Sequence, residues 1–142
     1  MGEKVLIIDD EQEFSQALAE RMTNRGMVVS TSGSAIEGLK CVEKNAFDVV
    51  ILDLQMPEMD GLEALKILKK KKPETQVILL TGHATVEKGI EAMKLGAMDL
   101  LEKPADLSTL TEKIKKAQAK KMILVEKKAE ARIKEIMETR GW

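Results

Sequence analysis

The chain has 142 residues, of which 44% are hydrophobic and 33% charged, with a net charge of −1, so it holds enough apolar material for one packed domain. No apolar run approaches the ~20 residues of a transmembrane helix, a strand-like segment leaves no room for a signal peptide, and Cys41 has no disulfide partner. Together these features exclude a membrane-spanning or disulfide-stapled protein and lead us to expect a cytoplasmic one.

Apolar segments and helical segments alternate along the sequence. Five short apolar segments are expected to form strands: 5–8, 27–31, 49–52, 77–80 and 98–101. Helical periodicity follows each of them, over about 10–25, 34–44, 60–72, 85–94 and 106–139. This alternation predicts an α/β fold in which a parallel sheet is covered by helices on both faces.

Helix ends are indicated by capping residues. Asp10 with Glu13, and Ser34 with Glu37, have the three-residue spacing of a capping box, in which a side-chain oxygen accepts a bond from a free backbone N–H. Gly26 follows the first helical segment, where glycine commonly terminates a helix. We therefore expect Asp10 and Ser34 to cap the first two helices.

Polar residues with complementary chemistry occur at the ends of the predicted strands. Asp9 and Asp10 follow the first strand, Asp53 the third, Thr81 the fourth and Lys103 the fifth. Because ligands of open α/β sheets bind beyond the carboxyl ends of the strands, these five residues are expected to meet. Clustered carboxylates repel one another, and a hard cation such as Mg²⁺ relieves that repulsion. The remaining hydroxyl and ammonium groups suit phosphoryl oxygens, and an aspartate can accept a phosphoryl group covalently.

Each of these residues has a structural explanation when it is considered alone. An aspartate at a strand end is usually a turn former or a helix cap, and a lone lysine is usually a solvated surface charge. Five suitable residues at the ends of four strands favour a common site over five separate structural roles.

The same segments resemble the response-regulator receiver family of two-component signalling. The resemblance rests on residues 5–11, 48–57, Asp60-Gly61, Thr81-Gly82-His83 and Lys103-Pro104, and it covers residues 4 to about 120. It implies a flavodoxin-like, doubly wound, five-stranded sheet of order 2-1-3-4-5. It also implies that a sensor histidine kinase or phosphotransfer protein donates a phosphoryl group, and that the chain is a signalling domain and not an enzyme.

The resemblance implies a role for each acidic residue of the site. Asp53 resembles the phosphoacceptor. Asp10, Asp53 and the backbone carbonyl of Gln55 resemble direct Mg²⁺ ligands, and Asp9 resembles the acidic partner that holds the ion through water. His83, with Gln55, flanks the expected phosphoryl position, where both side chains are expected to tune the lifetime of the phosphorylated state.

Further roles follow for residues on the fourth and fifth strands. Thr81 resembles the switch hydroxyl that moves toward the phosphoryl group, and the backbone amide of Gly82 is expected to face that group. Lys103 resembles the lysine that clamps the phosphoryl group, and the bond from it to Pro104 is expected to be cis.

Two positions depart from the family pattern. Leu100 occupies the place where the family usually has an aromatic residue whose rotation reports phosphorylation, and the chain has no tyrosine. Leu100 is therefore expected either to repack in a muted way or to leave signalling to shifts of loops and helices. Ala105 occupies a place where a larger apolar residue often follows the proline.

The chain is expected to consist of a receiver domain, residues 1–120, and a helical extension, residues 121–142, that continues the fifth helix. In the extension an apolar stripe recurs at three- and four-residue spacing: Met122, Val125, Ala129, Ile133 and Ile136. An isolated protruding helix is marginal in water, so we expect it to pair with a second copy; the alternative is a frayed tail. Direct nucleic-acid binding is not expected, although the tail is mildly basic, because a solvated helix face explains its lysines.

Thr81-Gly82-His83 and the long terminal helix resemble those of receivers that precede ATP-dependent transcriptional activator modules, but the sequence contains no phosphate-binding loop of such a module. Two alternative functions remain open at this point. One is a dimerisation scaffold without phosphotransfer. The other is a phosphatase of the haloacid-dehalogenase type, which would need an aspartate as general acid where Gln55 stands.

Overall fold

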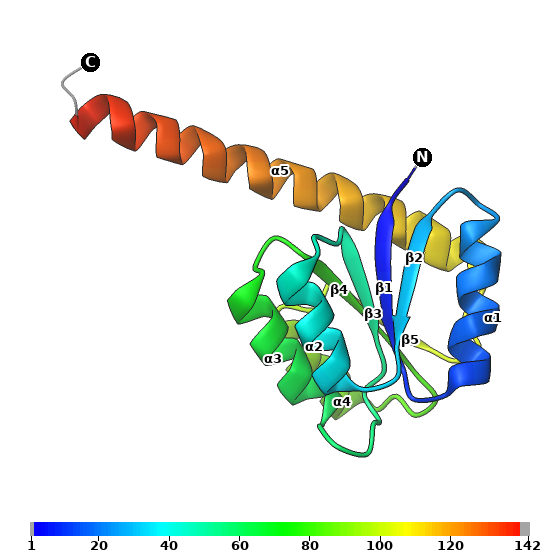
Figure 1. Cartoon of the computed structure of the whole chain (residues 1–142). Coiled ribbons are helices and arrows are strands. Elements are labelled where there is room, and N and C mark those ends of the chain that lie inside the picture. The colour runs from blue at the N-terminus through cyan, green and yellow to red at the C-terminus, as the bar shows by residue number, and fades with distance from the viewer. Residues whose placement is uncertain (1, 140–142) are drawn as a thin grey trace.

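The computed structural model describes residues 2–139 (Figure 1). These residues form five strands, β1 (Lys4–Ile8), β2 (Val28–Ser32), β3 (Val49–Leu52), β4 (Gln76–Thr81) and β5 (Asp99–Glu102). The strands alternate with five helices, α1 (Gln12–Thr23), α2 (Ala35–Lys44), α3 (Gly61–Lys71), α4 (Val86–Lys94) and α5 (Leu107–Thr139). Each strand lies where the sequence predicted it, with its ends displaced by at most one residue.

The strands form one parallel sheet of order β2-β1-β3-β4-β5, as the family resemblance implies. The order reverses direction between β1 and β3, which are neighbours in the sheet although α1, β2 and α2 separate them in sequence. Ile8 at the end of β1 pairs with Leu52 at the end of β3, and the Asp53 backbone N–H donates to the Ile8 carbonyl at 3.0 Å. The residues that follow these two strands therefore begin side by side.

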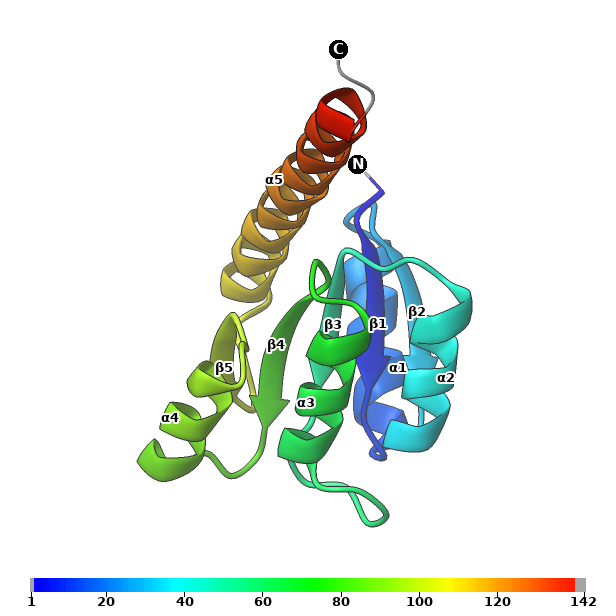
Figure 2. The same cartoon turned by 90° about the vertical axis from the view of Figure 1, so that its left-hand side faces the viewer.

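Helices cover both faces of the sheet (Figure 2). Two apolar clusters fill the two interfaces between the helices and the sheet. Along β1, Leu6 and Ile8 belong to the cluster beneath α2, α3 and α4, whereas Val5 and Ile7 belong to the cluster beneath α1 and α5. All four side chains are at most 1% exposed. This strand is buried on both faces, which explains why its sequence is continuously apolar instead of alternating.

Capping residues fix where three of the helices begin. The side chains of Ser34, Asp60 and Thr85 accept bonds from the backbone N–H groups of the first turns of α2, α3 and α4. The predicted cap at Asp10 is wrong: the residue before α1 is Glu11, and no side chain caps that helix. Instead the Asp9 carboxylate accepts the Glu11 backbone N–H at 2.9 Å. Asp10 therefore does not act as the cap of α1.

Helix α5 has 33 residues, a length of about 50 Å, and extends well beyond the domain (Figure 1). Leu110, Ile114 and Ala117 are fully buried against the sheet. Asp48 anchors the next turn, because its carboxylate accepts bonds from Gln118 at 3.3 Å and Lys121 at 3.4 Å, as well as from the Lys4 backbone at 2.8 Å.

Every residue from 122 to 139 is exposed, the apolar ones included. Residues 140–142, which complete the predicted extension, lie outside the described residues. In the part of the chain that the structure describes, no helix combines the length and apolarity needed to cross a bilayer.

Candidate functional site

The carboxyl edge of the sheet brings the predicted acidic residues together. One carboxylate oxygen from each of Asp9, Asp10 and Asp53 lies within 4.8 Å of the others. Asp9 and Asp53 are buried, at 3% and 4% exposure, whereas Asp10 is exposed to solvent. The cluster therefore has a buried floor and one open side through which a ligand can enter.

Lys103 reaches across this cluster from the loop after β5. Its Nζ lies 2.7 Å from Asp9 Oδ2, 3.2 Å from Asp53 Oδ2 and 3.1 Å from Glu11 Oε1. The ammonium also lies 4.3 Å from the centre of the Phe14 ring, close enough for a cation–π contact. The backbone N–H of Lys103 donates to the Thr81 carbonyl at 2.8 Å, and the Lys103–Pro104 peptide bond is cis.

Burial and neighbouring charges have opposite effects on the pKa of Lys103. Burial of the Lys103 ammonium by itself lowers its pKa, but hydrogen bonds to Asp9 and Glu11 and the charge of Asp53 raise that pKa above its ordinary value. For Asp9, burial outweighs the bond from Lys103 and raises the carboxyl pKa. Asp9 is therefore a carboxylate whose negative charge is incompletely compensated within the protein.

The same site can hold a divalent cation. Three carboxylates with oxygens less than 4.8 Å apart, one of them exposed, present the hard oxygen ligands that Mg²⁺ prefers in combination with water. Asp53 is held in place for this, because its Oδ1 accepts the Gln55 backbone N–H at 3.0 Å. A cation here would supply the positive charge that Asp9 and its neighbours lack.

The end of β4 supplies the hydroxyl. Thr81 is fully buried, and its Oγ1 accepts the backbone N–H of His83 at 3.4 Å, a long bond that little constrains the hydroxyl. Gly82 and His83 are exposed at the edge of the site. Among the hydrogen bonds within residues 2–139, none joins the Gly82 backbone or the His83 side chain to the Asp53 carboxylate.

Leu100 is half-buried on β5, beneath α4. A Cβ placed on Gly89 of α4 would lie only 3.3 Å from Leu100 Cδ2, so the helix backbone passes close above this side chain. The small residue on the helix leaves room for the leucine, and the contact ties the position of α4 to that of β5.

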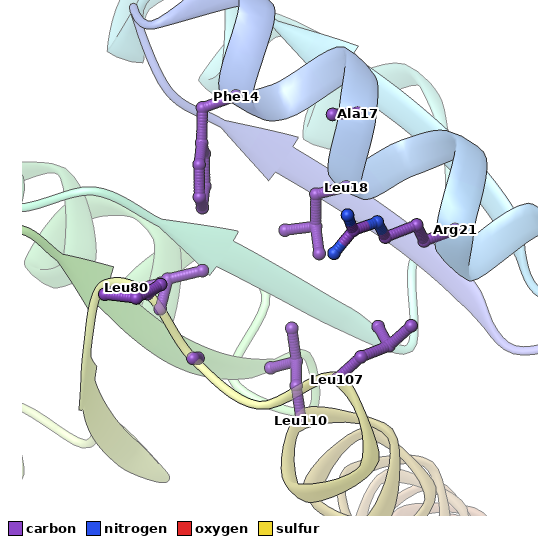
Figure 3. Close-up of a pocket in the computed structure, with 9 residues that line it drawn as sticks. Phe14, Ala17, Leu18, Arg21, Leu80, Leu107 and Leu110 are labelled. Carbon is purple, nitrogen blue, oxygen red and sulfur yellow. The ribbon is translucent and has the colours of Figure 1, made fainter.

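An apolar pocket of about 210 Å³ lies between α1, the end of β4 and the segment after β5. Figure 3 shows Phe14, Leu18 and Arg21 of α1 on one side of this pocket and Leu107 and Leu110 of α5 on the other, with Phe14 pointing toward Leu80 of β4. Ala105 lines this pocket, and a larger side chain there would fill part of it. Phe14 belongs both to the pocket and to the surroundings of Lys103.

Sequence reasoning missed two partners of Lys103. Glu11 and Phe14 lie one and four residues beyond Asp10, in the turn that leads into α1 and in its first turns. Neither residue was predicted from the sequence to belong to the site. Their position on the first turn after β1 was the available signal, because that turn faces the strand end.

The fold and the site together define a doubly wound α/β domain with an acidic, lysine-clamped site at the switch point of its sheet. A family model described as the response regulator receiver domain matches residues 5–115. The chain belongs to the response regulator receiver family, whose members are signalling domains that interact with histidine kinases or phosphotransfer proteins.

Individual relatives agree with this assignment. The chain is 32% identical over 107 residues to the photosynthetic apparatus regulatory protein RegA of Cereibacter sphaeroides, an alignment that covers 75% of this chain and 58% of the relative. It is 35% identical over 115 residues to the transcriptional regulatory protein ZraR of Escherichia coli, covering 81% of this chain and 26% of that protein. The chain thus spans only part of the length of these relatives.

Solved structures show the same fold. A response regulator receiver domain protein from Clostridium thermocellum superposes with a TM-score of 0.82 at 37% identity, covering 87% of this chain and 99% of that one. NtrX from Brucella abortus, solved in complex with ADP, gives a TM-score of 0.81 at 29% identity over 89% of this chain and 29% of its own.

The charge balance of the site leads to a first prediction. Replacing the Lys103 ammonium by an apolar group, as in Lys103→Met, leaves the buried Asp9 and Asp53 carboxylates without their cation. Removal of one partner from a buried ion pair costs roughly 3 kcal/mol. Urea unfolding in EDTA should therefore show Lys103→Met destabilised by about that amount. Millimolar Mg²⁺ should stabilise the variant more than the parent, and equal Mg²⁺ effects on both proteins would contradict this explanation.

Proposed function

We propose that Asp53 accepts a phosphoryl group from a histidine kinase or phosphotransfer protein, with Mg²⁺ bound beside it. The observation that carries the proposal is the position of the Asp53 carboxylate. One of its oxygens is fixed by the Gln55 N–H at 3.0 Å, and the other lies 3.2 Å from the Lys103 ammonium within an acidic cluster. The buried Asp53 carboxylate is thus held next to the Lys103 ammonium and the open side of the cluster. A carboxylate held in this way would be oriented for in-line attack on a phosphorus atom.

The residues around Asp53 would bind the cation and the phosphoryl oxygens. Asp10, Asp53 and the Gln55 carbonyl would hold the cation directly, and Asp9 would hold it through water. Bound there, Mg²⁺ neutralises charge that develops on the phosphoryl oxygens. Lys103, the Thr81 hydroxyl and the Gly82 backbone N–H would bind those oxygens. Attachment of the phosphoryl group would release Lys103 from part of its present carboxylate network.

Neither alternative function gains support. In a haloacid-dehalogenase-type phosphatase the residue at position 55 would have to act as a general acid, and the Gln55 carboxamide has no acidic proton to transfer at neutral pH. A scaffold without phosphotransfer gives no reason for Lys103 to be held by three carboxylates. The expected cytoplasmic location remains a prediction.

Lifetime of the phosphorylated state gives a second prediction. We expect Gln55→Ala and His83→Ala to change the rate of dephosphorylation by up to about tenfold, a barrier change of about 1.4 kcal/mol, because both alter access of water to the phosphoryl group. Phosphorylation itself should persist in both variants. Decay of the phosphorylated protein, followed by intact mass after removal of the donor, measures this; identical decay in both variants and the parent would refute it.

We further propose that residues 121–142 form an extension of the receiver domain through which two copies pair. Within residues 2–139, the last ion pair between α5 and the rest of the domain joins Lys121 to Asp48. The larger apolar side chains of the stripe beyond it are 40–62% exposed: Met122, Val125, Ile133 and Ile136. At 100° per residue, Lys128 and Arg132 lie on one side of this stripe, and Glu126 and Glu130 on the other. In a parallel pair the basic side of each helix meets the acidic side of its partner, so the charges favour a second copy as the occupant.

The pairing gives a third prediction. Light scattering should show the parent as a dimer and the double variant Val125→Glu/Ile133→Glu as a monomer. In a dimer of this variant, the introduced carboxylates would be buried without partners between the two helices. Lys127→Glu/Lys134→Glu, on the opposite side of the helix, is the matched control and should stay dimeric. Repeating the measurement with Mg²⁺ and beryllofluoride tests whether phosphorylation changes the assembly. A parent that is monomeric under both conditions would rule out pairing.

A further inference from the structure

A second feature of the site lies on its open side. A cleft of about 540 Å³ adjoins the acidic cluster and is lined by Asp10, Leu54, Gln55, Met56, Pro57, Asp60 and Lys88. Six of these residues come from the loops after β1 and β3. Lys88 comes from α4 on the other side, and it is the one cationic residue among those that line the cleft.

Lys88 differs from Lys103 in its ion pairs. Lys103 has three N–H donors and three carboxylate partners, Asp9, Glu11 and Asp53. Lys88 is half-buried, and none of the ion pairs found within residues 2–139 includes it. Lys88 is therefore the positive charge on this side of the site that a ligand could recruit without breaking an existing bond.

Local structure does not explain a lysine at this position. Thr85 caps α4, and its hydroxyl accepts the Lys88 backbone N–H at 3.2 Å, so Lys88 belongs to the first turn of the helix. The first turn carries the positive end of the helix dipole, where an acidic residue such as Glu87 is favourable and a lysine is not. The lysine therefore adds positive potential to the side of the cleft that faces Asp10 and Gln55.

An anionic donor needs positive charge on this side. Phosphoryl transfer from an acyl phosphate forms a bond between an Asp53 carboxylate oxygen and phosphorus. The bond from phosphorus to the acyl oxygen breaks, and the carboxylate leaves with the electron pair. The approaching donor is an anion that must come close to Asp9, Asp10 and Asp53, whose charges repel it.

We propose that Lys88 binds the anionic phosphodonor as it enters this cleft, a role that rests on the phosphoryl acceptance by Asp53 proposed above. Lys88 contributes to holding the donor before and during transfer. Loss of such uniform binding raises the donor concentration needed for half-saturation and leaves the limiting rate unchanged. The effect is electrostatic, so it weakens as salt is added.

The experiment measures phosphorylation rate against acetyl phosphate concentration at fixed Mg²⁺ in the full chain. Lys88→Ala should raise the half-saturating concentration roughly three- to tenfold, and Lys88→Arg, which keeps the charge, should stay close to the parent. Lys94→Ala removes an exposed lysine from the last turn of the same helix and should have no effect. Raising the ionic strength should slow the parent more than Lys88→Ala.

The outcomes separate this inference from the proposed function. An unchanged half-saturating concentration in Lys88→Ala, an equal loss in Lys88→Arg, or a fall confined to the limiting rate would overturn the role of Lys88 while leaving Asp53 as acceptor. A parent chain that binds Mg²⁺ but is not phosphorylated at all would overturn the proposed function, and the role of Lys88 with it.

Discussion

Asp53→Asn is expected to abolish phosphorylation by acetyl phosphate, with no added phosphoryl group detectable by intact mass after times that convert the parent completely. The substitution preserves the shape of the side chain and an oxygen that can accept the Gln55 N–H, seen at 3.0 Å in the parent. It removes the negative charge and the nucleophilic oxygen, and a carboxamide cannot form the aspartyl-phosphate. The loss should therefore be complete and not merely a slower reaction.

Asp106→Asn is the matched control for this prediction. Asp106 caps α5 by accepting the Thr109 backbone N–H at 3.1 Å, and asparagine caps helices as well as aspartate does. This variant makes the same chemical change outside the acidic cluster and should be phosphorylated like the parent. Phosphorylation of Asp53→Asn at the same rate as the parent would mean that another residue is the acceptor.

The sequence predicted the site because two physical rules act together. Buried parallel strands are continuously apolar, so β1, β3 and β4 were visible as short runs, and the first polar residue after each run marks a strand end. Parallel strands also bring all their carboxyl ends to one edge. Asp9, Asp53 and Lys103 therefore converge on one point, although the last is 94 residues from the first.

Details that depend on side-chain competition could not be predicted in this way. Asp10 had the spacing of a helix cap, but the turn after β1 is closed by Asp9, whose carboxylate accepts the Glu11 N–H and leaves α1 without a side-chain cap. The order of the sheet came from the family resemblance, because alternating strands and helices fit several right-handed arrangements. A role for Lys88 could not be predicted from the sequence, because the cleft that Lys88 lines forms only where α4 lies beside the loop between β3 and α3.

The backbone directly after Asp53 leads to a prediction about stability. Gly61 begins α3, and its N–H donates to the Leu54 carbonyl at 3.0 Å. A Cβ at this position would lie 2.4 Å from Leu54 Cα and 2.7 Å from the Asp53 carbonyl oxygen. These are backbone atoms that cannot rotate away, so either α3 or the segment after β3 must shift. We expect Gly61→Ala to lower the free energy of unfolding by about 3 kcal/mol, at the upper end of overpacking costs.

Gly33→Ala is the matched control, because its Cβ would meet nothing closer than 3.9 Å and its backbone is not in the left-handed region. This substitution should be neutral or stabilise by up to about 1 kcal/mol, since alanine restricts the unfolded chain. Urea unfolding of the three proteins measures the difference. In Gly61→Ala the shift should also weaken Mg²⁺ binding, because the displaced backbone carries Asp53 and the Gln55 N–H that orients it. Parental stability of Gly61→Ala would show that α3 does not press on the acceptor segment, whereas lost stability with parental Mg²⁺ affinity would show that α3 moves and the site does not.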